Sequence, residues 1–108
     1  MKDDRVYIAQ IQDAAHKVRV FVGTMTKEEF FEDQKTQSAV ILQLALIGEL
    51  AKHISNQTKE VIDLPWKDIA GFRDRAIHDY YNIDLEIVWL TVKEDVPLIA
   101  GALEGLSG

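Results

Sequence analysis

The sequence predicts an all-α protein: an up-and-down bundle of four main helices with one short extra helix. Apolar residues repeat at the alternating spacings of three and four that mark one face of a helix. β-Branched residues do not alternate with polar ones over any long stretch, and only two prolines, Pro65 and Pro97, interrupt the chain. Long amphipathic segments joined by short connectors favour a helical bundle over any sheet-containing fold.

The first predicted helix runs from about Asp3 to Val22. Gly23 follows it, at the position where glycine commonly ends a helix. Thr26 and Glu29 then form a capping-box pattern, which predicts the short extra helix. This short helix either continues into the next one or bends before it. The apolar stripe of the first helix is Ile8, Ile11, Ala15, Val18 and Val22.

The second long helix is expected over about Asp33 to Ser55. Its stretch Val40–Leu50 is apolar nearly all round, but Gln43 and Glu49 interrupt it, and a membrane span needs ~20 apolar residues. A helix that is apolar on every side is buried on every side, so we expect its outer face to meet another chain. Gly48 would let a neighbouring helix approach closely.

Asn56 is expected to end that helix, and a connector over about Gln57 to Asp63 has room for a helical turn. Pro65 then opens the third long helix, because proline is tolerated in a first turn, where its missing N–H is not needed. We expect this helix to reach about Tyr80.

The last helix is predicted to begin near Asp84. Pro97 lies inside it and predicts a kink near Lys93 to Val96, because proline removes one backbone hydrogen bond. We expect a single domain over residues 1–106 and a flexible tail at residues 107–108. The apolar stripe of this helix is Leu85, Trp89, Val92, Val96, Ile99, Leu103 and Leu106.

The composition excludes several classes of site. The 108 residues include no cysteine, which rules out disulfides, zinc–thiolate sites and thiol catalysis and fits a cytoplasmic protein. The three histidines lack the i,i+4 spacing of a zinc site, so we expect no metal and no cofactor. A net charge of −6 argues against a protein that mainly coats nucleic acid. An enzyme needs only a local positive patch, and an acidic chain suits a basic partner.

The chemical signal lies in the segment FRDRAIHDYY, where Arg73, His78 and Tyr80 form an R-x4-H-x-Y motif. Taken alone, the motif is weak evidence for a catalytic site. A single histidine there is more often a surface residue favoured by the helix C-terminus, and a single arginine is more often in a surface ion pair. The tyrosine alone would more often cover a core or an interface. His16 and His53, outside the motif, are interpreted as ordinary.

The sequence around this motif resembles the HepT-like branch of the HEPN superfamily, over nearly the whole chain. Asp74 departs from the pattern, because HEPN motifs often carry asparagine directly after the arginine, and this changes the local charge. The resemblance rests on FFEDQKTQSAVI, IGE, LPW and DLEIVW, at Phe30–Ile41, Ile47–Glu49, Leu64–Trp66 and Asp84–Trp89.

This resemblance implies a HEPN-like fold and a metal-independent endoribonuclease that acts on RNA as a homodimer. Arg73 and His78 of two protomers would meet in one cleft and be catalytic. The resemblance also implies the toxin of a type VII-like HEPN/MNT toxin–antitoxin system. Its partner would be a minimal nucleotidyltransferase that silences the toxin by attaching AMP to Tyr80. No membrane association is implied.

The residue chemistry fits this activity. RNA supplies its own nucleophile, the 2′-OH, and a histidine can move the protons. Asp74 lies four residues before His78, so we expect it to orient that ring, while Tyr80 would contact the phosphate. Arg73 and His78 do not share a helix face. Arginine's reach, fraying of the helix end or a second protomer must bring them together.

Two questions stay open at this stage. Glu49, inside an apolar run, is either buried and functional or paired across an interface. The chain as a whole is either a ribonuclease or a non-catalytic helical module that binds substrate for a separate nucleotidyltransferase.

Overall fold

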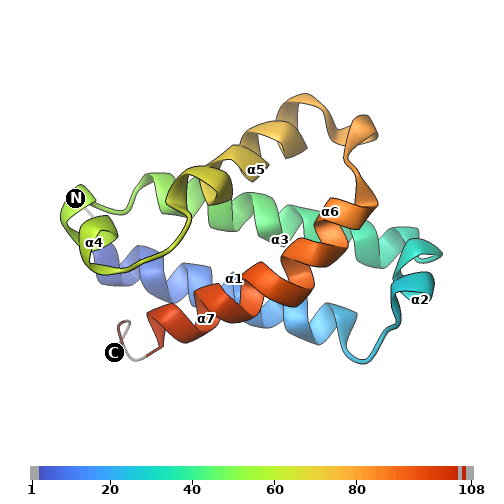
Figure 1. The fold of residues 1–108 in the computed structure, drawn as a ribbon, viewed down its shortest axis with the longest axis horizontal. Coiled ribbons are helices and arrows are strands. Elements are labelled where there is room, and N and C mark those ends of the chain that lie inside the picture. The colour runs from blue at the N-terminus through green and yellow to red at the C-terminus, as the bar shows by residue number, and fades with distance from the viewer. Residues whose placement is uncertain (1–2, 105, 107–108) are drawn as a thin grey trace.

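The computed structural model describes residues 3–104 and 106 and shows an all-α bundle (Figure 1). The predicted tail at residues 107–108 lies outside the described residues. Within the described part, α1 (Asp4–Val22), α3 (Gln34–Lys52) and α5 (Trp66–His78) are the long helices, and α3 packs against both others. The fourth main element is a rod of three segments that packs on α1 through its last segment, α7 (Val96–Leu103).

The first helix forms as its stripe predicts. Asp3 caps the N-terminus by accepting a hydrogen bond from the backbone N–H of Arg5. Gly23 ends the helix with a positive φ of 53°, which glycine adopts without strain, and its N–H bonds the carbonyl of Arg19. All five stripe residues are buried, so this face of α1 forms part of the core.

The capping box at the next helix is confirmed. Thr26 and Glu29 exchange hydrogen bonds at the start of α2 (Lys27–Phe31), and Phe30 is fully buried. This helix does not continue into the next one. Asp33 caps α3 separately, accepting from the backbone N–H of Thr36.

The predicted end of α3 is wrong. The helix stops at Lys52 rather than Ser55, and Asn56 begins a further helix, α4 (Asn56–Val61), instead of ending one. The reason is Ser55, whose hydroxyl caps the backbone N–H of Thr58. Asp4 accepts from the hydroxyls of both Ser55 and Thr58, which ties α4 to the start of α1.

The predicted end of α5 is also wrong. The helix starts after Pro65 as expected but ends at His78, because Asp79 leaves the helical region with φ −146° and ψ 42°. Tyr80 lies instead in η1, a short 3₁₀ turn over Tyr80–Asn82. Tyr80 therefore does not continue the helical face of Arg73.

The kink predicted from Pro97 is present. Asp84 caps α6 (Leu85–Leu90), a π-helical turn η2 (Thr91–Asp95) follows, and α7 (Val96–Leu103) carries Pro97 in its first turn. Proline lacks the backbone N–H that a regular helix would use as a donor. The π-helical turn before α7 already departs from the regular hydrogen-bonding pattern, so the missing N–H of Pro97 falls where that pattern is altered. The rod thus bends without ending (Figure 1).

Candidate ribonuclease site

The site is built where α3 and α5 cross closely. A Cβ on Gly48 would lie 2.6 Å from the Cβ of Arg73 and 2.7 Å from the carbonyl oxygen of Ile69. Only glycine allows this approach, so the expectation of close helix packing at Gly48 is confirmed within the chain. The crossing places the Arg73 backbone directly against α3.

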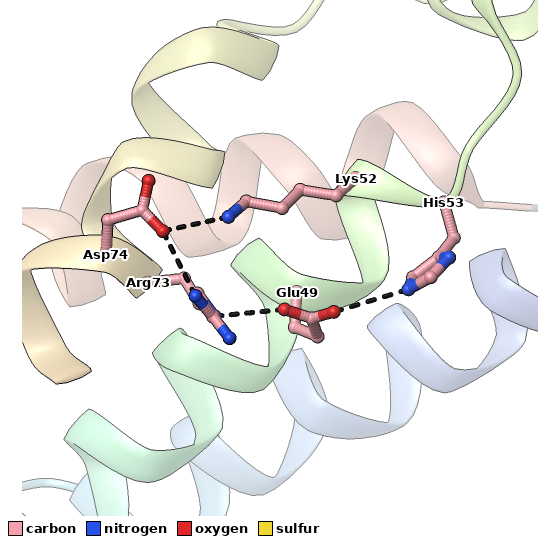
Figure 2. Close-up of polar contacts among 5 residues, drawn as sticks. All are labelled: Glu49, Lys52, His53, Arg73 and Asp74. Carbon is pink, nitrogen blue, oxygen red and sulfur yellow. Dashed lines mark hydrogen bonds and ion pairs between the residues drawn. The ribbon is translucent and has the colours of Figure 1, made fainter.

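Two carboxylates hold the Arg73 guanidinium (Figure 2). Its Nε lies 2.9 Å from Oε1 of Glu49, and its Nη1 donates to Oδ1 of Asp74 at 3.2 Å. The Nε atom is buried and its N–H is not directed at an acceptor, so the Glu49 contact is an ion pair without a hydrogen bond. Within the described part of the chain, Nη2 donates no hydrogen bond.

These contacts belong to a longer network of alternating charges between α3 and α5. Lys52 donates to Oδ1 of Asp74 at 2.8 Å, and Nε2 of His53 lies 3.3 Å from Oε2 of Glu49 (Figure 2). The hydrogen bonds from Lys52 and Arg73 hold the pKa of Asp74 below its ordinary value. The carboxylate therefore stays charged throughout the neutral range and keeps hold of both cations.

The imidazole of His53 is fixed from two sides. Its ring stacks on Tyr7 of α1, with centroids 5.2 Å apart and planes inclined by 15°, while its Nε2 faces Glu49. His53 is therefore part of the network around Arg73, and the interpretation of it as an ordinary histidine missed this. The spacing of Glu49, Lys52 and His53 along one helix, next to Gly48, is the sequence signal that would have found the group.

His78 is in a different situation. It is the last residue of α5 and is exposed, and it makes no hydrogen bond or ion pair with the other residues that the structure describes. The expected contact from Asp74 is not formed, because Lys52 and Arg73 take that carboxylate. One chain thus positions Arg73 and leaves His78 free.

Tyr80 lies beyond the helix end and close to the start of α3. Its hydroxyl is 3.0 Å from the hydroxyl of Ser38, and its ring meets Tyr81 edge-on at 5.7 Å. An open groove of about 450 Å³ adjoins it, lined partly by Ile41 and Ile83. Tyr80 as a whole residue is 41% exposed.

The outward face of α3 is apolar beside this site. Leu42, Leu46, Glu49 and His53 follow one another at spacings of 4, 3 and 4 and therefore share one helix face. Leu42 is 57% exposed and Leu46 is 41% exposed, whereas the opposite face, with Leu44 among others, is buried. We call the four residues Leu42, Leu46, Glu49 and His53 the outer face of α3.

No three histidine or acidic residues among 3–104 and 106 come together in a way that could hold a metal ion. None of the helices in that part of the chain is both long and apolar enough to cross a membrane.

Comparison with known proteins identifies the family. The model of the Ribonuclease HepT-like family matches residues 11–105. The chain belongs to this family. Probable ribonuclease HepT of Thermococcus cleftensis is 40% identical over 101 residues, which cover 93% of this chain and 92% of that protein.

Two further relatives align over similar lengths. Putative RNase MJ1380 of Methanocaldococcus jannaschii is 35% identical, over 95% of each chain. Putative RNase TTE0752 of Caldanaerobacter subterraneus is 32% identical, over 90% of this chain and 88% of that protein. No solved structure matches the chain. The match of the family model reaches from α1 through α7 and includes the whole R-x4-H-x-Y motif.

Proposed function

We propose that this HepT-like chain is a metal-independent endoribonuclease whose catalytic residues are Arg73 and His78. The observation that carries the proposal is the state of the Arg73 guanidinium. Glu49 and Asp74 contact two of its nitrogens, and the third, Nη2, donates no hydrogen bond to the described residues. A preformed cation with free N–H groups suits an RNA phosphate.

The reaction would use the 2′-OH of the substrate itself. One His78 imidazole takes the 2′-OH proton as the oxygen attacks phosphorus, and a second delivers a proton to the departing 5′-oxygen. The products are a 2′,3′-cyclic phosphate and a free 5′-OH. Arg73 would stabilise the negative charge that builds up on the phosphate oxygens during attack.

The two proton transfers call for two imidazoles, and this favours a homodimer. One chain offers a single exposed His78, while the outer face of α3 exposes Leu42 and Leu46 beside Arg73. Packing these faces against each other would bury the leucines and bring both motifs into one cleft. This arrangement also answers how Arg73 and His78, on different faces of α5, meet at one phosphate.

We further propose that the chain is the toxin of a type VII-like HEPN/MNT pair, with a minimal nucleotidyltransferase as its antitoxin. The Tyr80 oxygen would attack the α-phosphorus of ATP, releasing pyrophosphate and forming a Tyr80–AMP ester. Tyr80 is accessible, and its hydroxyl is oriented by Ser38. A bulky anion two residues after His78 would block RNA and repel its phosphates.

Cleavage of RNA in EDTA tests the ribonuclease. Wild-type protein is expected to leave 2′,3′-cyclic phosphate ends, and His78→Ala to abolish cleavage, while His16→Ala, an exposed histidine on α1, keeps it. Equal cleavage by wild type and His78→Ala would exclude this site. Absence of cleavage by pure wild type would instead favour the non-catalytic, substrate-binding partner of a nucleotidyltransferase.

Mass spectrometry after co-expression with the nucleotidyltransferase tests the modification. One or more added AMP masses are expected on wild type and on Tyr81→Phe, and none on Tyr80→Phe. Tyr81 is a matched control because it is adjacent and 98% exposed. AMP retained by Tyr80→Phe would assign the modification elsewhere.

A further inference from the structure

We infer that Glu49 is the positioning residue of Arg73: it holds the guanidinium at Nε, so that the N–H groups of Nη2 stay available to the substrate phosphate. This inference rests on the proposed ribonuclease function. It assigns a role to a residue outside the R-x4-H-x-Y motif, on a different helix, and it follows from how α3 and α5 meet.

The first step is the position of Glu49. It directly follows Gly48, where the close contact of α3 with α5 brings the two backbones together. The Arg73 side chain must therefore leave the crossing along α3, past the carboxylate. The structure shows the result, because Nε of Arg73 is only 2.9 Å from Oε1 of Glu49.

The second step concerns which carboxylate contacts which nitrogen of the guanidinium. Glu49 from α3 meets the Nε edge, and Asp74 from α5 meets Nη1, so the planar group is held from two helices (Figure 2). The N–H of Nε is buried without a well-directed acceptor, which leaves electrostatic attraction as the contact that fixes this edge. The Arg73 side chain is 28% exposed, and Nη2 is the nitrogen that neither donates a hydrogen bond to the described residues nor is buried without one.

The third step concerns the groups that fix Glu49 itself. Its other oxygen faces His53, whose ring is stacked on Tyr7 of α1. Lys52 on the same helix is directed to Asp74 and not to Glu49. The carboxylate is thus placed between one cation and one imidazole, and α1, α3 and α5 together set its position.

A competing interpretation of the contact between Glu49 and Arg73 predicts the opposite change in activity. If Glu49 merely occupied Arg73 until RNA displaced it, removing its charge would raise activity. If Glu49 positions Arg73, removing the charge lowers turnover, because misplacing a catalytic cation by about 1 Å costs roughly 100-fold. In both cases one fewer negative charge near the cleft would leave KM unchanged or lower it.

Steady-state cleavage of a defined RNA by Glu49→Gln separates these interpretations. We expect kcat to fall roughly 10- to 100-fold with KM unchanged or lower, and Glu60→Gln, an exposed glutamate on α4, to behave as wild type. Added to Arg73→Lys, Glu49→Gln should lower kcat much less than it does alone, because its effect passes through the arginine. Equal losses in both backgrounds, or a gain in kcat, would overturn the inference.

A second measurement does not depend on activity. In ¹⁵N-labelled wild-type protein the buried Nε–H of Arg73 should give a separate, slowly exchanging NMR signal. Glu49→Gln should shift or broaden it, and Glu60→Gln should not. An unchanged signal in Glu49→Gln overturns the positioning role even if RNA is not cleaved. Inactive wild type with the expected signal change would reject the ribonuclease and keep the contact.

Discussion

The two proposed catalytic residues, Arg73 and His78, differ in how much of their surroundings one chain provides. Arg73, in the middle of α5, is pressed against α3 at Gly48 and held by two carboxylates. His78, at the end of the same helix, is exposed and makes no hydrogen bond or ion pair with the other described residues. Under the proposed mechanism, one protomer would prepare phosphate binding, and a second protomer would complete proton transfer.

The largest expected effect is a loss of RNA cleavage, and it is shared by Arg73 and His78. Arg73→Ala and His78→Ala should each lower RNA cleavage by at least about 100-fold, because each removes a group that the proposed mechanism uses in the transition state. Cleavage rates on one RNA, measured in EDTA, compare them directly. A variant that retained more than about a tenth of wild-type activity would remove its residue from the catalytic site.

The close crossing behind Arg73 can be broken without touching the motif. Gly48→Ala places a Cβ 2.6 Å from the Arg73 Cβ, and we expect about 1–3 kcal/mol of destabilisation, seen as a lower Tm. Gly101→Ala on α7 is the matched control, since its Cβ would meet no atom within 4 Å. It should stabilise the helix by up to about 1 kcal/mol. Equal Tm changes in the two variants would contradict the crossing.

A smaller effect, on the free energy of unfolding, distinguishes Arg73 from His78. Arg73→Ala should lower the free energy of unfolding by about 1 kcal/mol, because it leaves Glu49 without its cation in a partly exposed network. His78→Ala should change it by less than about 0.5 kcal/mol, since no contact is lost within the chain. Chemical denaturation measures both. A larger loss for His78→Ala would show that the histidine is held within one chain.

The smallest expected effect is a pH dependence of stability that comes from Asp95, in the rod formed by α6, η2 and α7. Burial, Glu94 and Asp68 raise the pKa of Asp95 above its ordinary 3.8, whereas Lys52 and Arg73 lower that of Asp74. A raised folded pKa means that stability falls as pH rises through 3.8 and then through the folded pKa. Asp95→Asn should therefore raise Tm slightly at pH 7, with the gain vanishing below about pH 3.8.

Asp74→Asn should do the reverse. The lowered pKa of Asp74 contributes stability that is present above 3.8 and is lost as pH falls through the lower folded value. The variant should therefore be slightly less stable than wild type at pH 7 and equal to it in strong acid. Tm values across this pH range test both substitutions, and a loss in both, or a gain in both, would contradict the assigned neighbours.

Much of the fold could be predicted because its signals are local. The α1 stripe, the capping box at Thr26 and the kink around Pro97 each depend on a few neighbouring residues. The helix ends were harder to predict. Ser55 restarts a helix where Asn56 was expected to stop one, and Asp79 ends α5 before Tyr80.

The candidate site could be predicted only in part, for a related reason. The sequence singles out Arg73 and His78 but places Asp74 beside the histidine, because i,i+4 spacing considers one helix alone. In the folded chain α3 brings Lys52 to that carboxylate and Glu49 to the arginine. Partners supplied by a second helix depend on the crossing at Gly48, which a helical spacing cannot locate.

The proposed mechanism requires a second protomer that completes the site across the outer face of α3. Leu46→Glu would place a charge there, and Leu98→Glu, at a similarly exposed leucine on α7, is its control. Sedimentation and EDTA-resistant cleavage, measured on the same samples, give the direct test. We predict that Leu46→Glu is monomeric and inactive, while wild type and Leu98→Glu are dimeric and active. A monomeric Leu46→Glu protein that cleaves RNA at the wild-type rate would contradict the account.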